Sequence, residues 1–157
     1  METKTPPEPR DALDELHGYY FEDLRTGMSA VYAKTVSETD IVMFAGISGD
    51  DNPLHLNHDF ARRSIFKGPV AHGSLTASFV STVIGTRLPG PGCIYVRQSL
   101  NFRAPVRAGD TVVARTTIKK LVPEKRFAIM ETACTVDGRV VLDGEALVLV
   151  PTRPDSG

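Results

Sequence analysis

The sequence predicts an α+β domain in which a curled antiparallel sheet wraps around one central helix. Two observations support this prediction. Residues 73–88 are apolar or small with a single charge, so they predict a helix that is buried nearly all round. Residues 93–150 contain long β-prone runs separated by turn residues, which predict an antiparallel meander. Because the helix needs apolar cover on several sides, we expect the sheet to curl around it.

A strand and a helix are expected before the central helix. Residues 28–36 are rich in Val, Tyr and Ala without helical spacing, which favours a strand. Ser37, with Asp40 three residues later, is typical of a capping box, so a helix should begin there. Gly49 is suited to the left-handed residue that ends such a helix, and Pro53 cannot continue it.

A surface excursion should join this first helix to the central one. Asn57 is placed to cap a second short helix, which Gly68 and Pro69 would end. A Pro-Gly-Pro-Gly run ends the central helix, and Asp137-Gly138 is a strong signal for a two-residue hairpin. The strands expected around that hairpin cover residues 93–102, 111–121, 126–136 and 139–150.

A buried helix followed by a curled meander is the architecture called the hot dog fold. Residues 1–17 are rich in proline and charge, and we expect a flexible N-terminal arm there. Residues 18–157 should form a single domain. The composition, 41% hydrophobic and 24% charged over 157 residues, is ordinary for one globular core.

Charge and composition argue against several classes of function. With 18 basic and 19 acidic residues the net charge is -1, so no global field favours nucleic acid or anionic lipid. Cys93 and Cys134 are far apart and lack the spacing of a redox or zinc site. No run approaches membrane-spanning length, and the N-terminus lacks a signal-peptide core. We therefore expect a cytoplasmic protein that binds neither nucleic acid nor membrane.

The densest polar cluster, residues 48–55, directly follows the first expected helix. One interpretation is a plain helix stop and turn, because Gly, Asp, Asn and Pro are turn formers. The other is catalytic, because Asp50 and His55 are residue types that carry protons. On a continuous helix their side chains would diverge by about 140°. Gly49 and Pro53 would have to supply the turn that lets them converge.

Two linked motifs suggest a family. The pattern S-G-D-x-N-P-x-H is met by Ser48, Gly49, Asp50, Asn52, Pro53 and His55, and Ala71-His72-Gly73 follows it. Through these motifs the chain resembles the MaoC-like (R)-specific enoyl-CoA hydratases and their dehydratase relatives. The likeness extends from Tyr-Phe-Glu-Asp-Leu at 20–24 through Phe-Arg-Ala-Pro-Val at 102–106 to the last strands. It covers nearly all of the chain beyond the arm.

The resemblance implies that Asp50 and His55 are the catalytic pair, with the acid and base roles assigned jointly. Together they can hold one water, which supplies hydroxide to C3 and a proton to C2 of an enoyl thioester. Gly73 begins the central helix, whose backbone N–H groups could bind the thioester oxygen, although tight packing would equally demand glycine. Asn52 and Ser81 are supporting residues that either orient the pair or satisfy local backbone groups.

The remaining polar candidates carry weaker signals. The four histidines lack the spaced carboxylates or thiols of a metal site, and His72 is assigned a structural role. Some basic residues could meet the phosphates of coenzyme A, although most should be solvated surface charge. These residues are Arg62, Arg63, Lys67, Arg87, Arg97, Arg103 and Arg107.

By this resemblance the chain is expected to be a lyase, an (R)-specific enoyl-CoA hydratase. It would hydrate trans-2-enoyl-CoA, such as crotonyl-CoA, reversibly and in syn fashion to (R)-3-hydroxyacyl-CoA. No metal and no cofactor are expected, because coenzyme A is part of the acyl-CoA substrate, and the chain should form a homodimer. The alternatives are a 3-hydroxyacyl thioester dehydratase acting on acyl carrier protein or branched acyl-CoA, a hot dog acyl-CoA thioesterase, and a non-catalytic acyl-thioester binder.

Overall fold

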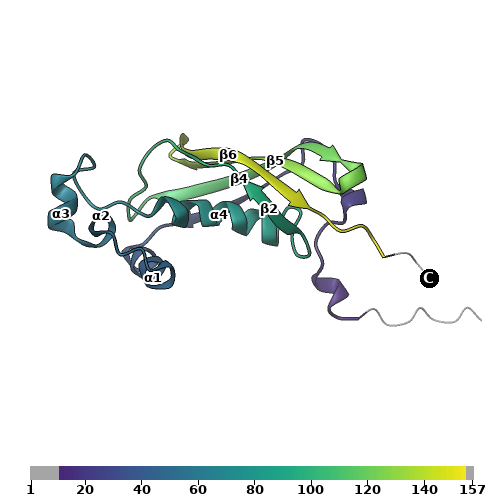
Figure 1. Cartoon of the computed structure of the whole chain (residues 1–157), viewed down its shortest axis with the longest axis horizontal. Coiled ribbons are helices and arrows are strands. Elements are labelled where there is room, and N and C mark those ends of the chain that lie inside the picture. Colours follow the sequence, from purple (N-terminus) through teal and green to yellow (C-terminus); the bar gives the residue numbers. More distant parts are fainter. Residues whose placement is uncertain (1–10, 155–157) are drawn as a thin grey trace, which may run out of the picture.

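A computed structural model describes residues 11–154 of the chain (Figure 1). Residues 1–10 of the predicted arm lie outside the described residues. The elements follow in the order η1 (Asp14–Leu16), η2 (Phe21–Asp23), β1 (Ser29–Thr35), α1 (Glu38–Ser48), α2 (Pro53–Leu56), α3 (His58–Arg63), α4 (Gly73–Thr86), β2 (Ile94–Gln98), β3 (Asn101–Phe102), β4 (Thr111–Val122), η3 (Pro123–Lys125), β5 (Phe127–Val136) and β6 (Arg139–Leu149). None of the helices described is long and apolar enough to cross a membrane.

The strands form one antiparallel sheet with the order β1-β4-β5-β6-β2, and β3 also pairs with β6. Burial alternates along β4 and β5, as expected for strands with one face against a core. That face lies against α4, which runs along the sheet, while α1, α2 and α3 gather at one end (Figure 1). The predicted α+β architecture of a helix against an antiparallel sheet is therefore confirmed.

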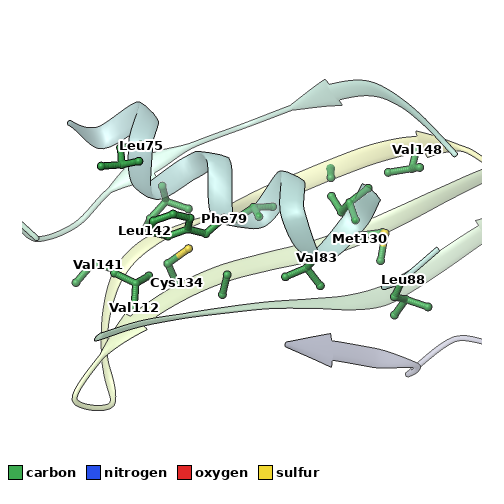
Figure 2. Close-up of a cluster of buried hydrophobic side chains, with 14 of the residues drawn as sticks. Leu75, Phe79, Val83, Leu88, Val112, Met130, Cys134, Val141, Leu142 and Val148 are labelled. Atoms are coloured by element: carbon green, nitrogen blue, oxygen red, sulfur yellow. The ribbon is translucent and has the colours of Figure 1, made fainter. Parts of the chain in front are cut away.

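The core lies between α4 and the sheet. Figure 2 shows Leu75, Phe79 and Val83 of the helix extending toward Met130 and Leu142 of the strands. All five side chains are buried. Burying a large apolar side chain of this kind contributes about 1.5–3 kcal/mol. This contact fixes the height of α4 over the sheet and thereby the position of its first residue, Gly73.

The central helix is buried on one side only, which differs from the prediction. Leu75, Phe79 and Val83 face the core, but Ser81 and Gly85 are exposed on the other side. The prediction of burial nearly all round was wrong for one chain, because the sheet covers a single side of the helix. The residues on the uncovered side are small and uncharged, so in the sequence they look the same as buried residues.

Most of the local predictions are confirmed. The Ser37 hydroxyl accepts a hydrogen bond from the Asp40 N–H at 3.1 Å, and the Ser37 N–H donates to the Asp40 carboxylate at 2.8 Å. Gly49 ends α1 with a φ of 79°. Asp137 and Gly138 both have positive φ, as a type I′ hairpin turn requires.

Two local predictions need correction. The strand expected over 93–102 is divided into β2 and β3, with a register shift between Tyr95 and Arg97. Helix α2 was not predicted, because Pro53 was taken only as a residue that stops a helix. Pro53 in fact occupies the first turn of α2, where its missing N–H costs no hydrogen bond, and Asn52 caps that helix.

Candidate active site

A chain of short polar contacts turns the backbone between α1 and α2. The Asp50 N–H donates to the Ser48 hydroxyl at 3.1 Å, and the Asn52 N–H donates to Asp50 Oδ1 at 3.2 Å. The Leu54 N–H then donates to Asn52 Oδ1 at 3.0 Å, which starts α2. Each bond uses a side chain to satisfy the backbone two residues further on, which is the usual device of Asx-type turns. The turn folds Asp50 back toward His55.

Asp50 and His55 lie together, as predicted. Asp50 Oδ2 is 4.0 Å from His55 Nε2. This distance is too long for a direct hydrogen bond, but one water can lie about 2.8 Å from both atoms. The Asp50 side chain is 53% exposed and that of His55 only 11%. The pair therefore stands at the boundary between solvent and the interior.

The contact of His55 with the main chain assigns its ring protons. His55 Nδ1 lies 2.7 Å from the carbonyl oxygen of Val70. A carbonyl oxygen only accepts hydrogen bonds, so Nδ1 carries a proton and donates it there. In the uncharged ring Nε2 is then left with a lone pair that faces Asp50. This arrangement suits a group that accepts a proton from a bound water.

His72 also belongs to this cluster. Its Nε2 lies 2.8 Å from the main-chain oxygen of Asp50, and its ring stacks on His55 with centroids 3.7 Å apart and an angle of 28°. His72 is 2% exposed, which agrees with the structural role predicted for it. The contact with His55 was not predicted, because no local signal relates residues 17 positions apart.

The histidines are less scattered than the sequence suggested. Donor atoms of Asp50, His55 and His72 lie within 4.8 Å of one another, as metal ligands can. However, His72 Nε2 must donate its proton to the Asp50 carbonyl, which removes that nitrogen as a ligand. The other ring nitrogen of His72, Nδ1, is buried without a partner among the described residues, so Asp50 and His55 are the donors that solvent reaches, whereas zinc sites use three or four protein ligands. This donor set fits acid/base chemistry better than metal binding.

A largely apolar cavity of about 460 Å³ lies beside the pair. His55 and Gly73 are part of its wall, and Asp50 is not. The remaining lining is Leu54, Phe66, Val70, Ala71, Ser74, Thr76, Phe102, Arg103, Ala104, Pro105, Val106 and Val141. A second cavity, of about 310 Å³, also includes His55 and is lined by Glu38, Ile41, Val42, Leu56, His58, Pro69, Arg107 and Ala108. The His55 ring thus contributes to the walls of both.

Gly73 packs closely against the ring of Phe102 at the start of α4. A Cβ at this position would lie 2.6 Å from Cε1 of Phe102, which is closer than such atoms approach in proteins. This contact supports the packing reason that the sequence left open, although the Phe102 ring is 58% exposed and can yield more easily than backbone. Gly73 also lines the larger cavity, where the first N–H groups of α4 lack partners within the helix. The binding role remains a prediction.

The two supporting residues have different positions. Asn52 caps α2 through its side chain, so it satisfies the local backbone and holds the turn that carries Asp50. Ser81 is exposed on α4, about 12 Å along the helix from Gly73, and lines neither cavity. Within one chain Ser81 is not brought to the pair. Its supporting role stays a prediction.

Two of the basic residues considered for phosphate binding line the cavities. Arg103 donates two hydrogen bonds to the Asp143 carboxylate, at 2.9 and 3.2 Å. These bonds raise the pKa of Arg103 and lower that of Asp143. Arg107 donates to the carbonyl oxygens of Phe66 and Pro69 at 2.5 and 3.1 Å. Because both guanidinium groups are engaged within the chain, contact with phosphates stays a prediction.

Comparisons with known proteins give the family of the chain. The model of the family described as "MaoC like domain" matches residues 22–138. An (R)-specific enoyl-CoA hydratase of Rhodospirillum rubrum is 59% identical over 142 residues, which are 90% of this chain and 99% of the relative. A 3-hydroxybutyryl-CoA dehydratase of Methylorubrum extorquens is 50% identical over 144 residues, 92% of each chain.

The solved structures give the same result for the fold. The (R)-hydratase from Aeromonas caviae involved in PHA biosynthesis has a TM-score of 0.80 and 38% sequence identity, covering 83% of this chain and 99% of that one. This likeness confirms the predicted hot dog fold. The family model and the long, high-identity alignments show that the chain belongs to the MaoC-like domain family.

Proposed function

We propose that this protein is an (R)-specific enoyl-CoA hydratase, a hydro-lyase that adds water reversibly to trans-2-enoyl-CoA and forms (R)-3-hydroxyacyl-CoA. One observation carries the proposal. Asp50 Oδ2 and His55 Nε2 lie 4.0 Å apart. Because His55 Nδ1 donates its proton to the Val70 oxygen, Nε2 is free to accept a proton. The high identity to relatives named as enoyl-CoA hydratase and 3-hydroxybutyryl-CoA dehydratase supports it.

The reaction requires one proton to leave water and one proton to reach C2. The Asp50–His55 pair takes a proton from the water as its oxygen bonds to C3, and the π electrons of the C2–C3 bond move toward the thioester oxygen. The pair then returns a proton to C2, so it ends in its starting protonation state. Because water and pair lie on one face of the substrate, the addition is syn.

The thioester oxygen gains negative charge during the attack and needs hydrogen-bond donors. The N-terminus of α4 at Gly73 offers free backbone N–H groups and the positive end of the helix dipole. Gly73 and His55 share the wall of the same cavity, which supports a thioester placed between them. The thioester itself activates C3, so we infer that the reaction needs no metal and no cofactor besides the coenzyme A of the substrate.

The larger cavity is our candidate for the acyl chain. Its lining is mainly apolar, and about 460 Å³ is enough for a short acyl group such as crotonyl. We therefore propose short-chain enoyl-CoA as the substrate. The two free cysteines, Cys93 and Cys134, support a cytoplasmic location, where thiols stay reduced.

We also propose that the protein is a homodimer. The uncovered side of α4 carries small residues such as Ser81 and Gly85, and β2 lies at an edge of the sheet with Ile94 and Val96 exposed. An apolar edge strand next to an uncovered helix side favours pairing with a second copy. Light scattering should give twice the 17.1 kDa mass of one chain. Val96→Lys should shift that mass toward the monomer, and a monomeric wild-type protein would contradict the proposal.

The deciding experiment offers the purified protein crotonyl-CoA and follows loss of the conjugated enoyl absorbance, with the chirality of the product analysed. We expect fast hydration to the (R)-3-hydroxy product. Release of free thiol instead would indicate a thioesterase. Much faster dehydration of a 3-hydroxyacyl carrier protein than of the coenzyme A thioester would indicate the carrier-protein dehydratase. Binding without turnover would indicate a non-catalytic subunit, and each of these three outcomes would overturn the proposal.

A further inference from the structure

We propose that His72 is the positioning residue of the site, holding Asp50 through its main chain and His55 through its ring. This inference rests on the proposed function, because it concerns how Asp50 and His55 are held at the separation that one bridging water can span. His72 does not reach the reacting atoms in this role. It acts through the two residues that do.

The hydrogen bond to Asp50 is the first contact that supports this role. Asp50 is half exposed, and its carboxylate accepts a hydrogen bond from the Asn52 N–H two residues away. Its main-chain oxygen, in contrast, lies 2.8 Å from the buried Nε2 of His72. This bond ties the exposed turn of residues 49–52 to the first residue before α4. The main chain that carries the Asp50 carboxylate is thereby attached to a buried side chain.

The ring contact is the second. His55 is held at its edge by Val70, which sets the direction of Nδ1. The His72 ring lies against the face of the His55 ring, with ring centroids 3.7 Å apart. The Phe44 ring packs against His72 with a centroid distance of 4.9 Å. A ring held at one edge and on one face cannot rotate without losing a contact. His72 therefore fixes the direction in which His55 Nε2 points.

The unsatisfied nitrogen of His72 argues that the side chain is more than core filling. Nδ1 is buried and has no hydrogen-bond partner among the described residues, and the side chain makes no capping bond to α4. Burying an unpaired polar atom lowers stability, so an apolar ring would fill this space at less cost. What a histidine adds over an apolar ring here is the N–H that reaches Asp50.

Two variants separate the two contacts. His72→Phe keeps an aromatic ring against His55 but has no donor for the Asp50 oxygen, whereas His72→Gln keeps an N–H of similar reach but has no ring. We expect kcat for crotonyl-CoA to fall between about 10- and 100-fold in His72→Phe, with KM within about twofold, because a misplaced catalytic group slows chemistry more than binding. His72→Gln should lower kcat by only about two- to fivefold, because it keeps the bond to Asp50 and loses the ring contact with His55.

The control is His17→Phe. His17 also stacks on an aromatic ring, Tyr20, at 4.0 Å, and also contacts a carbonyl oxygen, that of Gly18 at 2.9 Å, but it is not part of this cluster. Its kcat should equal that of wild type. Wild-type kcat in His72→Phe would overturn the proposal. So would parallel losses of kcat, substrate binding and thermal stability in both His72 variants, because those losses would indicate a purely structural role.

A measurement on the wild-type protein tests the hydrogen bond without any activity. Long-range ¹H–¹⁵N NMR spectra of the histidine rings report which nitrogen carries the proton. We expect His72 to be protonated at Nε2 and His55 at Nδ1. His72 protonated only at Nδ1 would refute the bond to Asp50. A wild-type protein that shows the expected ring protons but does not hydrate crotonyl-CoA would instead count against the proposed function alone.

Discussion

The substitution Asp50→Asn separates the proton chemistry of the site from its structure. Asparagine has nearly the same shape as aspartate, and its oxygen can still accept from the Asn52 N–H, as Asp50 Oδ1 does at 3.2 Å. The amide group then replaces Oδ2, which lies 4.0 Å from His55 Nε2, and it can neither take nor return a proton. Because the side chain is 53% exposed, stability should change by less than about 0.5 kcal/mol.

The expected loss is in turnover. Acid/base groups contribute about 10²- to 10⁴-fold to rate, so kcat for crotonyl-CoA should fall by at least about 100-fold, which is about 2.7 kcal/mol of barrier. The assay follows the enoyl absorbance over a range of substrate concentrations, beside a thermal unfolding curve. Asp51→Asn is the matched control, because it makes the same change of charge at the adjacent exposed residue. If Asp50→Asn kept kcat within about threefold, or if Asp51→Asn lost as much, the site assignment would be refuted.

Three further predictions concern the same region. His55→Ala should lower kcat by about 100-fold or more. It should also lower the unfolding temperature, because the largely buried ring bonds to Val70 and stacks on His72; equal kcat for variant and wild type would remove His55 from the mechanism. Gly73→Ala should lower the free energy of unfolding by about 1–3 kcal/mol in denaturant titrations, because the added Cβ meets the Phe102 ring at 2.6 Å; the double variant with Phe102→Leu should recover part of that loss. Hydrogen bonds from the Ser37 backbone and hydroxyl hold the pKa of Asp40 below its ordinary 3.8. This carboxylate therefore adds stability that is present above about pH 4 and is lost as the pH falls through the lowered pKa, so Asp40→Asn should weaken the acid dependence of unfolding measured between about pH 5 and pH 2.

Elements defined by neighbouring residues could be predicted from the sequence. The capping box at Ser37 and Asp40, the left-handed Gly49 and the hairpin at Asp137-Gly138 each depend on a few adjacent residues. The convergence of Asp50 with His55 could also be predicted, since it follows from a turn that Asx-type hydrogen bonds build within six residues.

Features that depend on tertiary contacts could not be predicted in this way. The sequence shows α4 as small and apolar, but the exposure of Ser81 depends on how far the sheet extends around the helix. Helix α2 was missed because Pro53 is compatible both with a helix stop and with a first helical turn. The stacking of His72 on His55 results from the path of residues 56–71, which returns the chain to α2. Nothing in the local sequence encodes that return.

The geometry gives a physical reason why the two sequence motifs occur together. The first motif supplies Asp50 and His55, but their orientations are set from the segment that contains the second. Val70 accepts the Nδ1 proton of His55, His72 holds both members of the pair, and Gly73 starts the helix beside them. In the proposed mechanism the water between Asp50 and His55 is therefore positioned by two short segments, each of which is incomplete alone.

The intervening residues have a different task. Helix α3, His58–Arg63, lies between the two segments and exposes Phe60, while the return is secured by the bond from the Val70 N–H to the Leu54 oxygen at 3.2 Å. The bond from the Ala71 N–H to Val106 at 2.7 Å then ties the second segment to the strand side of the domain. Changes at His58 or Phe66 would alter the walls of the two cavities, in which these residues of the excursion take part. A change in the main chain at residues 70–73 would move His55, Asp50 and the start of α4 at once.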